Sequence, residues 1–186
     1  MRYDQLLSAV RRFQPRFILE IGTWNGHRAL QMLQLSPGAT YYGFDLFEDA
    51  DVKTDAEEKN VKPHHTLASI QARLSGYKAH LFKGNTRETL GDFKEPVDFA
   101  WIDGGHSVET IRSDWENVKR CLLPGANVYF DDYYSGGIDT EQFGCNRVVD
   151  ELRHEVLPDR DPVIPSGWVQ MVCVFPDETD PYLQTR

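Results

Sequence analysis

Three carboxylates are the side chains of this sequence best placed to act together in chemistry. Asp103 ends the apolar segment VDFAWID, and Asp131 and Asp132 end the segment ANVYFDD. If these segments are neighbouring parallel strands, their acids converge at the carboxyl edge of the sheet, where such sheets bind ligands. Crowded carboxylates repel one another unless one is protonated or a cation lies among them, and oxygen ligands suit Mg²⁺. The three acids therefore predict a magnesium site.

A magnesium ion held by these acids would bind a substrate hydroxyl, lower its pKa and orient its oxygen for reaction. The alternative is that Asp131 and Asp132 only cap a turn. His106 closely follows Asp103, and a histidine with an ordinary pKa of about 6.5 could take the hydroxyl proton as general base. Equally, His106 could be a residue at a helix start that hydrogen-bonds the ligand or the backbone.

A glycine loop lies nearer the start of the chain, in the segment EIGTWNG at residues 20–26. Gly22 and Gly26 would let the backbone approach a ligand closely, and Glu20 could reach a charged amine of the ligand directly or through water. The spacing is not the dinucleotide-binding G-x-G-x-x-G, and no P-loop lysine follows. Because strand–glycine–helix turns are common, the loop alone is weak support for a ligand site. Trp24, on this loop, is the tryptophan expected to touch a ligand.

Asp45 ends the next apolar segment, TYYGFDLF. In doubly wound nucleotide-binding proteins, an acid at this place accepts hydrogen bonds from ribose hydroxyls. Taken alone, Asp45 is more often a helix or turn cap. Together with the glycine loop that precedes it, the ribose interpretation is favoured.

Apolar periodicity predicts strands that alternate with helices, which is typical of an α/β fold with a doubly wound, mostly parallel sheet. The last two strands are joined by the short turn Ser166-Gly167, too short for a parallel crossover, so the last strand should be antiparallel. Seven strands are expected in FILEI, TYYGFDLF, AHLFKG, VDFAWID, ANVYFDD, PVIP and WVQMVCVF. Helices are expected over 3–13, through Ala29 and Leu33, from Leu67 to Tyr77, after Thr86, from Val108 to Leu122, and from Val148 to Val156.

Residues 48–63 are charged and end at Pro63, which favours an exposed excursion between elements. Its place at the ligand edge of the sheet is where closing loops usually lie. We therefore expect residues 46–63 to be mobile without ligand and to become ordered over the site when ligand binds.

Five segments, in this order and spacing, resemble a class I S-adenosylmethionine-dependent methyltransferase: ILEIGTWNG, YYGFDLF, HLFKGNTRETL, VDFAWIDGGHS and LLPGANVYFDDY. More narrowly, they are similar to the small-molecule O-methyltransferases related to the macrocin and catechol enzymes. The resemblance covers residues 15–135 and implies a Rossmann-like methyltransferase fold, in which an antiparallel last strand is usual. It implies one methyltransferase domain over residues 1–186, which would methylate a small-molecule hydroxyl with the help of a metal.

The resemblance also assigns roles to individual residues. Glu20, Gly22 and Gly26, with Thr23 between them, would hold the methionine part of S-adenosylmethionine, and Asp45 would hold the ribose. Further cofactor contacts would come from Asn85 and Thr86 beside the adenine and from Asp103 and His106 on the remaining wall. In the same resemblance Asp103, Asp131 and Asp132 would bind Mg²⁺, and His106 and Asp103 would be catalytic.

Composition limits the partners of this 186-residue chain. Its net charge of −9 argues against nucleic acid, which is bound by clustered Lys and Arg. No apolar run is long enough to span a membrane, and no secretory signal is visible. Three widely spaced cysteines suit free thiols in the cytoplasm. A small-molecule acceptor is the partner that remains.

Some alternatives stay open at this point. The related enzymes usually carry more sequence before the first strand, so the cap over the substrate must come from residues 46–63, from residues 133–144 or from a second subunit of a homodimer. The chain could also be a methyltransferase without a metal, or a non-catalytic member that binds the cofactor. A nicotinamide-dependent oxidoreductase is disfavoured by the missing G-x-G-x-x-G.

Overall fold

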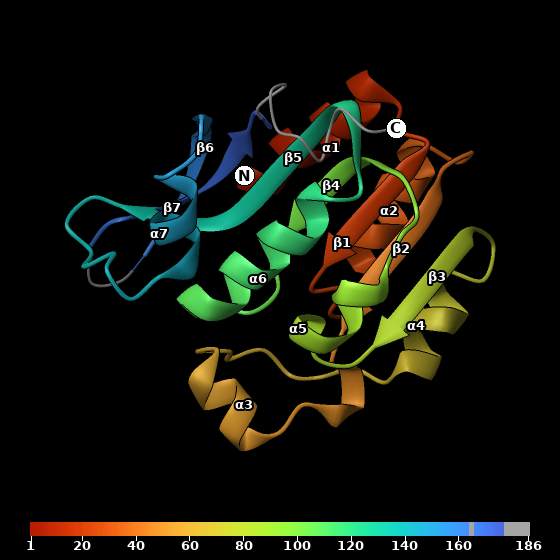
Figure 1. The fold of residues 1–186 in the computed structure, drawn as a ribbon, viewed down its shortest axis with the longest axis horizontal. Helices are drawn as coiled ribbons and strands as arrows, with labels where there is room; N and C mark the ends of the chain where they lie inside the picture. The colour runs from red at the N-terminus through yellow and green to blue at the C-terminus, as the bar shows by residue number, and fades with distance from the viewer. Residues whose placement is uncertain (164–165, 177–186) are drawn as a thin grey trace.

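The fold is built on a mixed β-sheet with helices on both faces. The structure, a computed structural model, describes residues 1–163 and 166–176, and within them seven strands form one sheet in the order β3-β2-β1-β4-β5-β7-β6 (Figure 1). The strands β1 to β5 pair in parallel, and β7 is antiparallel to both β5 and β6. Their bounds are β1 Phe17–Ile21, β2 Thr40–Asp45, β3 Lys78–Lys83, β4 Val97–Ile102, β5 Leu122–Ser135, β6 His154–Pro162 and β7 Trp168–Val174. The predicted doubly wound sheet with an antiparallel last strand is confirmed.

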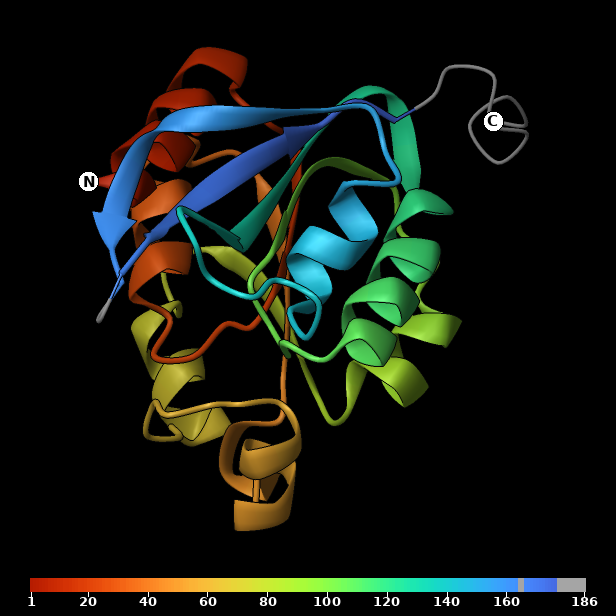
Figure 2. The same ribbon diagram turned by 90° about the vertical axis from the view of Figure 1, so that its left-hand side faces the viewer.

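The helices divide between the two faces of the sheet, as Figure 2 shows. One face carries α1, α2 and α4, and the other carries α5, α6 and α7. The described helices are α1 Arg2–Phe13, α2 His27–Leu35, α3 Val52–Glu57, α4 Leu67–Arg73, α5 Thr86–Thr89, α6 Val108–Lys119 and α7 Gly144–Val149, with 3-10 turns η1 Phe47–Asp49 and η2 Leu90–Asp92. In the described ranges, no helix has the length and apolar character to cross a membrane.

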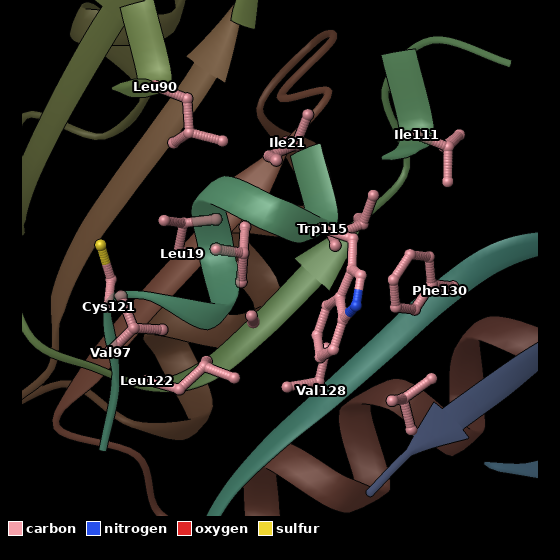
Figure 3. Packing of buried hydrophobic residues seen from close by; sticks show 14 of the residues in the cluster. Leu19, Ile21, Leu90, Val97, Ile111, Trp115, Cys121, Leu122, Val128 and Phe130 are labelled. Carbon is pink, nitrogen blue, oxygen red and sulfur yellow. The ribbon is translucent and has the colours of Figure 1, made fainter. Parts of the chain in front are cut away.

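The core explains why β4 is apolar throughout. Every residue of β4 is buried, since helices cover both of its faces. On one face, the Trp115 ring of α6 lies 5.9 Å from the ring of Phe130 in β5, among the aliphatic side chains seen in Figure 3. On the other face, Leu6 and Val10 of α1 are fully buried. The helices that carry the loops of the site are thus fixed by apolar packing on both sides of the sheet.

A β-bulge interrupts β5 at the acidic pair. Phe130 faces Val172 and Tyr133 faces Gln170, so two residues of β5 lie opposite one residue of β7. Asp132 takes a left-handed conformation with φ 58°, which Asp adopts more readily than most residues. Successive side chains of a regular strand point to opposite faces, so the bulge is what lets the two acids share partners.

The last part of the chain differs from the prediction. The helix expected from Val148 to Val156 ends at Val149, because the chain then turns and Val156 pairs with Val172 in β6. The strand expected at PVIP contributes only Pro162 to β6, and its residues 164–165 lie outside the described residues. The fifth strand is longer than ANVYFDD, since it continues along β7 to Ser135.

The turn after β1 gives a test of this packing. Gly22 has φ 88°, and a Cβ atom placed on it would lie 2.0 Å from the carbonyl oxygen of Asp103. Gly22→Ala is therefore expected to lower the free energy of unfolding by about 2 kcal/mol or more, through backbone strain and displacement of the Asp103 loop. Urea unfolding measures this. Gly38→Ala is the control, because a Cβ there meets nothing within 4 Å, and an equal loss in both variants would contradict the explanation.

Candidate active site

A cavity lies at the carboxyl ends of β1, β2 and β4. The space between its walls, with the open solvent at its mouth included, is about 880 Å³. The segment that carries α3 forms one wall, and in Figure 1 this segment lies beyond the ends of β1 and β3. Of the residues predicted to bind the cofactor, those that line the cavity are Gly22, Asp45, Asn85, Thr86, Asp103 and His106.

Three predicted cofactor residues do not line the cavity. Glu20 is buried with 1% of its surface exposed, and its carboxylate accepts a hydrogen bond from the hydroxyl of Tyr41. The Thr23 hydroxyl is 3.3 Å from the same tyrosine oxygen. A Cβ on Gly26 would meet Ile70 of α4 at 2.8 Å, so this glycine serves the packing of the loop against a helix. The start of the glycine loop thus packs on the buried, hydrogen-bonded side chains of Glu20, Thr23 and Tyr41 beneath the cavity.

Burial sets the protonation of Glu20. Removal of its carboxylate from water raises its pKa to about 8, against the lowering effect of the Tyr41 hydrogen bond. Tyr41 is buried too, and burial together with the charge of Glu20 raises its pKa well above the usual value. Near neutral pH the pair therefore holds a proton that an exposed glutamate would release.

Asp45 joins the glycine loop to the turn after β2. Its Oδ2 accepts a hydrogen bond from the backbone N–H of Trp24 at 2.7 Å, and its Oδ1 accepts one from the N–H of Phe47 at 2.8 Å. The carboxylate is partly exposed and faces the cavity, so each oxygen keeps capacity for a further donor. Asp45 is thus a turn cap and a cavity residue at once.

A second, smaller cavity adjoins the first and contains the acidic cluster. Asp103, Gly104, Gly105 and His106 line both cavities, while Asp131 and Asp132 line only the second. The structure therefore brings the three predicted metal-binding acids to one place, as the pairing of β4 with β5 requires. Burial, reinforced by the neighbouring negative charges, raises the pKa of Asp103 to about 7 and that of Asp131 well above its usual value.

His106 is held at both ring nitrogens. Nε2 lies 2.7 Å from Oδ2 of Asp132, and Nδ1 lies 2.7 Å from the backbone carbonyl oxygen of Glu58. Both oxygens can only accept, so the ring satisfies both contacts when it is protonated. Burial lowers the pKa of His106, but the hydrogen bond to Asp132 outweighs this and raises it above the usual value. Burial likewise opposes ionisation of Asp132, yet the bond from His106 keeps its pKa lowered.

Two cations that sequence reasoning missed also reach the acids. Arg2, in the first turn of α1, places Nη1 3.1 Å from Oδ1 of Asp132 and Nη2 3.2 Å from Oδ2 of Asp131. Lys62 lies in the wall of the first cavity, and the negative charge of Asp103 raises its pKa. Arg2 is remote from the acids in sequence and belongs to no motif, so only the packing of α1 reveals the contact.

Residues 46–63 cover the first cavity and are fastened to α6. The Glu58 carboxylate accepts hydrogen bonds from the backbone N–H groups of His106 and Ser107, each at 2.8 Å, and from the hydroxyls of Ser107 and Thr110. Burial raises the pKa of Glu58, but these hydrogen bonds together keep it below its usual value. An acid at the start of a helix is a favourable arrangement. The segment lies at the edge of the sheet that the sequence indicated, and its mobility without ligand stays a prediction. Sequence reasoning missed Glu58, whose partners lie far along the chain.

The other end of the covering segment rests on the glycine loop. Trp24 donates a hydrogen bond from Nε1 to the carbonyl of Pro63 at 2.9 Å, and Lys62 lies 5.5 Å from its ring centre. His64 contacts Asp55 of α3 at 2.8 Å. Trp24 lines the cavity, as expected, and at the same time anchors the segment that closes it.

Comparisons with known proteins agree with this fold. The chain matches the methyltransferase-domain family over residues 19–133. No curated protein matches it. Among solved structures, the O-methyltransferase TomG from Streptomyces achromogenes, in complex with SAM, superposes with a TM-score of 0.65 at 16% identity, over 92% of this chain and 78% of that one.

Two further solved structures, which carry different named activities, are also similar to this chain. An O-methyltransferase from Bacillus cereus in complex with SAH has a TM-score of 0.61 at 19% identity, over 92% of this chain and 79% of that one. An rRNA methylase from Streptococcus thermophilus has a TM-score of 0.64 at 16% identity, over 94% and 96%. The chain belongs to the methyltransferase-domain family, and its fold is that of a class I S-adenosylmethionine-dependent methyltransferase.

The buried Glu20 makes stability depend on pH. Its folded-state pKa of about 8 lies above the unfolded value, so between these values the folded state holds more protons and stability falls as pH rises. Glu20→Gln is expected to remove this fall, which amounts to roughly 3–5 kcal/mol between pH 5 and pH 9. Urea unfolding across this range measures it. A wild type whose stability falls no more steeply than that of the variant would contradict the assignment.

The Glu58 contacts predict how the covering segment moves. Glu58→Gln removes the charge at the start of α6 and should speed amide hydrogen exchange in residues 46–63 by about tenfold or more without ligand. Glu57→Gln is the matched control, since Glu57 is exposed and forms a surface ion pair with Lys53 at 3.8 Å. Equal exchange rates in both variants would show that Glu58 does not fasten the segment.

Proposed function

We propose that this protein transfers the methyl group of S-adenosylmethionine to a hydroxyl oxygen of a small molecule. The observation that carries the proposal is the shared wall of the two cavities. Residues 103–106 line both the first cavity and the smaller second cavity, which Asp131 and Asp132 also line. A methyl donor in the first cavity and an acceptor in the second would therefore meet at this wall, which is the alignment that methyl transfer requires.

The first cavity suits the cofactor in several places. Asp45 would accept hydrogen bonds from ribose hydroxyls with the capacity that its backbone contacts leave over. Asn85 and Thr86, at the start of α5, would lie beside the adenine, and Gly22 would border the methionine part. Glu20 and Thr23 would act indirectly, because they support the loop from below.

In the reaction, the cofactor supplies a methyl group whose bond to sulfur breaks, with its electron pair kept by sulfur, as the bond to oxygen forms. His106 would take the hydroxyl proton at Nε2 when its ring is neutral, with the single ring proton on Nδ1 and the acceptor hydroxyl lying between Nε2 and Asp132. The Glu58 carbonyl holds Nδ1–H and so fixes the ring for this role. Asp132 then stabilises the protonated ring, and Asp103 borders the path between the cavities.

Assistance by Mg²⁺ is a narrower form of this proposal that the arrangement of the residues does not favour. Oxygen ligands suit the ion, and the three acids converge as predicted. However, Arg2 lies between Asp131 and Asp132, and His106 holds the other oxygen of Asp132. In the described ranges, no three acidic, histidine or cysteine side chains are grouped as metal ligands. The residues as arranged do not fit a divalent ion, and the proton transfer proposed here uses none.

The acceptor is proposed to be a small molecule, since one neighbour is an O-methyltransferase involved in tomaymycin synthesis. RNA is the other candidate class, because an rRNA methylase shares the fold. A net charge of −9 disfavours an RNA backbone, which needs clustered cations. The cytoplasm is the proposed location, because Cys145 and Cys173 are buried as thiols in the core.

Cofactor binding is tested by calorimetry with S-adenosylmethionine and its demethylated product. Both should bind, and Asp45→Ala should weaken binding by about 1.5–3 kcal/mol, the range for hydrogen bonds that involve a charged group. Asp92→Ala is the control, since Asp92 is an exposed acid outside the cavity. Absence of heat with either ligand, combined with binding of NAD, would refute the assignment.

Turnover is tested with S-adenosylmethionine carrying a labelled methyl group and a panel of phenols, catechols and sugar alcohols. With an acceptor in hand, His106→Gln should reduce kcat by about 100-fold or more, since it removes the proton acceptor. His27→Gln, at an exposed position, should retain the wild-type rate. Cofactor binding without transfer to any acceptor would instead favour a non-catalytic member of the family.

A further inference from the structure

The acidic cluster already contains the positive charge that it needs. Asp131 is fully buried as a side chain, and neither of its carboxylate oxygens accepts a well-formed hydrogen bond among the described residues. Burial of such a carboxylate without a counter-charge is strongly unfavourable. The cation that meets it is the guanidinium of Arg2, whose side chain is itself only 11% exposed.

The guanidinium stands in the position that a bridging metal would need. Its two terminal nitrogens point to different acids, one to Asp131 at 3.2 Å and one to Asp132 at 3.1 Å, and its Nε is 3.6 Å from Asp161 of β6. A magnesium ion requires carboxylate oxygens about 2.0–2.1 Å away from it, in near-octahedral order. Carboxylate oxygens that flank a guanidinium cannot at the same time converge on such an ion.

The fold holds Arg2 firmly in this place. Arg2 begins α1, and this helix is fixed on the sheet by the fully buried Leu6 and Val10. The following Tyr3 packs edge-on against Trp101 of β4, with ring centres 6.0 Å apart, and its hydroxyl accepts a hydrogen bond from Nη2 of Arg2 at 2.8 Å. The β-bulge in β5 turns the carboxylate of Asp132 toward the same guanidinium.

We infer that Arg2 takes the place of a divalent metal ion in this site, so that a cation supplied by the first helix, with Lys62 beside Asp103, balances the acids. The inference deepens the proposed function and rests on it only where turnover is concerned. Arg2 is a positioning residue: it holds Asp131 and Asp132, and through Asp132 it fixes the orientation of His106. The site would consequently discriminate against metals rather than recruit them.

Binding of Mn²⁺, measured from the electron paramagnetic resonance of the free ion, tests this directly. The wild-type chain should bind Mn²⁺ at this site weakly if at all, and Arg2→Met should bind it at least about tenfold more tightly than any binding seen for the wild type. Asp131→Asn added to Arg2→Met should abolish that binding. Arg12→Met, on the exposed side of the same helix, is the control and should behave as the wild type does.

Two results would overturn the inference: tight Mn²⁺ binding by the wild type that is lost in Asp131→Asn, or no gain of Mn²⁺ binding in a folded Arg2 variant. Thermal melts establish folding, and Arg2→Gln replaces Arg2→Met if the latter does not fold, since its amide can still hydrogen-bond a carboxylate. Calorimetry with S-adenosylmethionine on the same samples separates the two proposals. A wild type that binds neither S-adenosylmethionine nor Mn²⁺ contradicts the proposed function while the Arg2 inference stands.

Discussion

The burial of three carboxylates at one edge of a parallel sheet is the constraint on which the rest of this structure depends. Asp103 follows β4, and Asp131 and Asp132 lie at the bulge of the neighbouring β5, so their repulsion in a poorly solvated place must be balanced. Three basic side chains from different parts of the chain balance the negative charge. They are Arg2 of α1, Lys62 of the segment before α4, and His106 at the start of α6. The charge balance of the site thus joins elements that are distant in sequence.

The same residues connect charge balance with closure of the cofactor cavity. Glu58 binds the start of α6 through its carboxylate and holds the ring of His106 through its carbonyl. His106 in turn contacts Asp132, which meets Arg2. A movement of residues 46–63 would therefore alter the mouth of the first cavity. It would also alter the hydrogen bonds that set the protonation of His106 in the second cavity. Glu58 therefore links the covering segment to His106 by direct contact.

Backbone geometry, as well as charge, fixes the positions of these hydrogen-bonded side chains. Gly22 passes so close to the Asp103 carbonyl that no side chain fits between the two loops. Below them, Glu20 and Tyr41 fill the space with a protonated polar pair. The acid that ends β1 is therefore part of the floor of the site, whereas the acid that ends β2 faces the cavity directly.

The sequence by itself determined the layered fold and the edge at which the site lies. Its strand pattern, its short last turn and the acids at its strand ends are local signals, so each can be read from a few adjacent residues. The strand-end signals also brought Asp45 and His106 into the candidate site, and the resemblance to methyltransferases added Asn85; all three line the cavity. The predicted helix from Val148 to Val156 was wrong after Val149, because the chain turns there and then pairs with β7 as β6.

Only the tertiary structure decided what balances the acids. Arg2 lies about 130 residues before its partners, and its contact with them depends on where α1 packs and on the bulge in β5. Likewise, the place of Glu20 beneath the cavity follows from the face of β1 on which it lies, next to Tyr41 of β2. A local motif shows which groups end a strand, but it does not show which distant cation comes to meet them, because that contact is a property of packing.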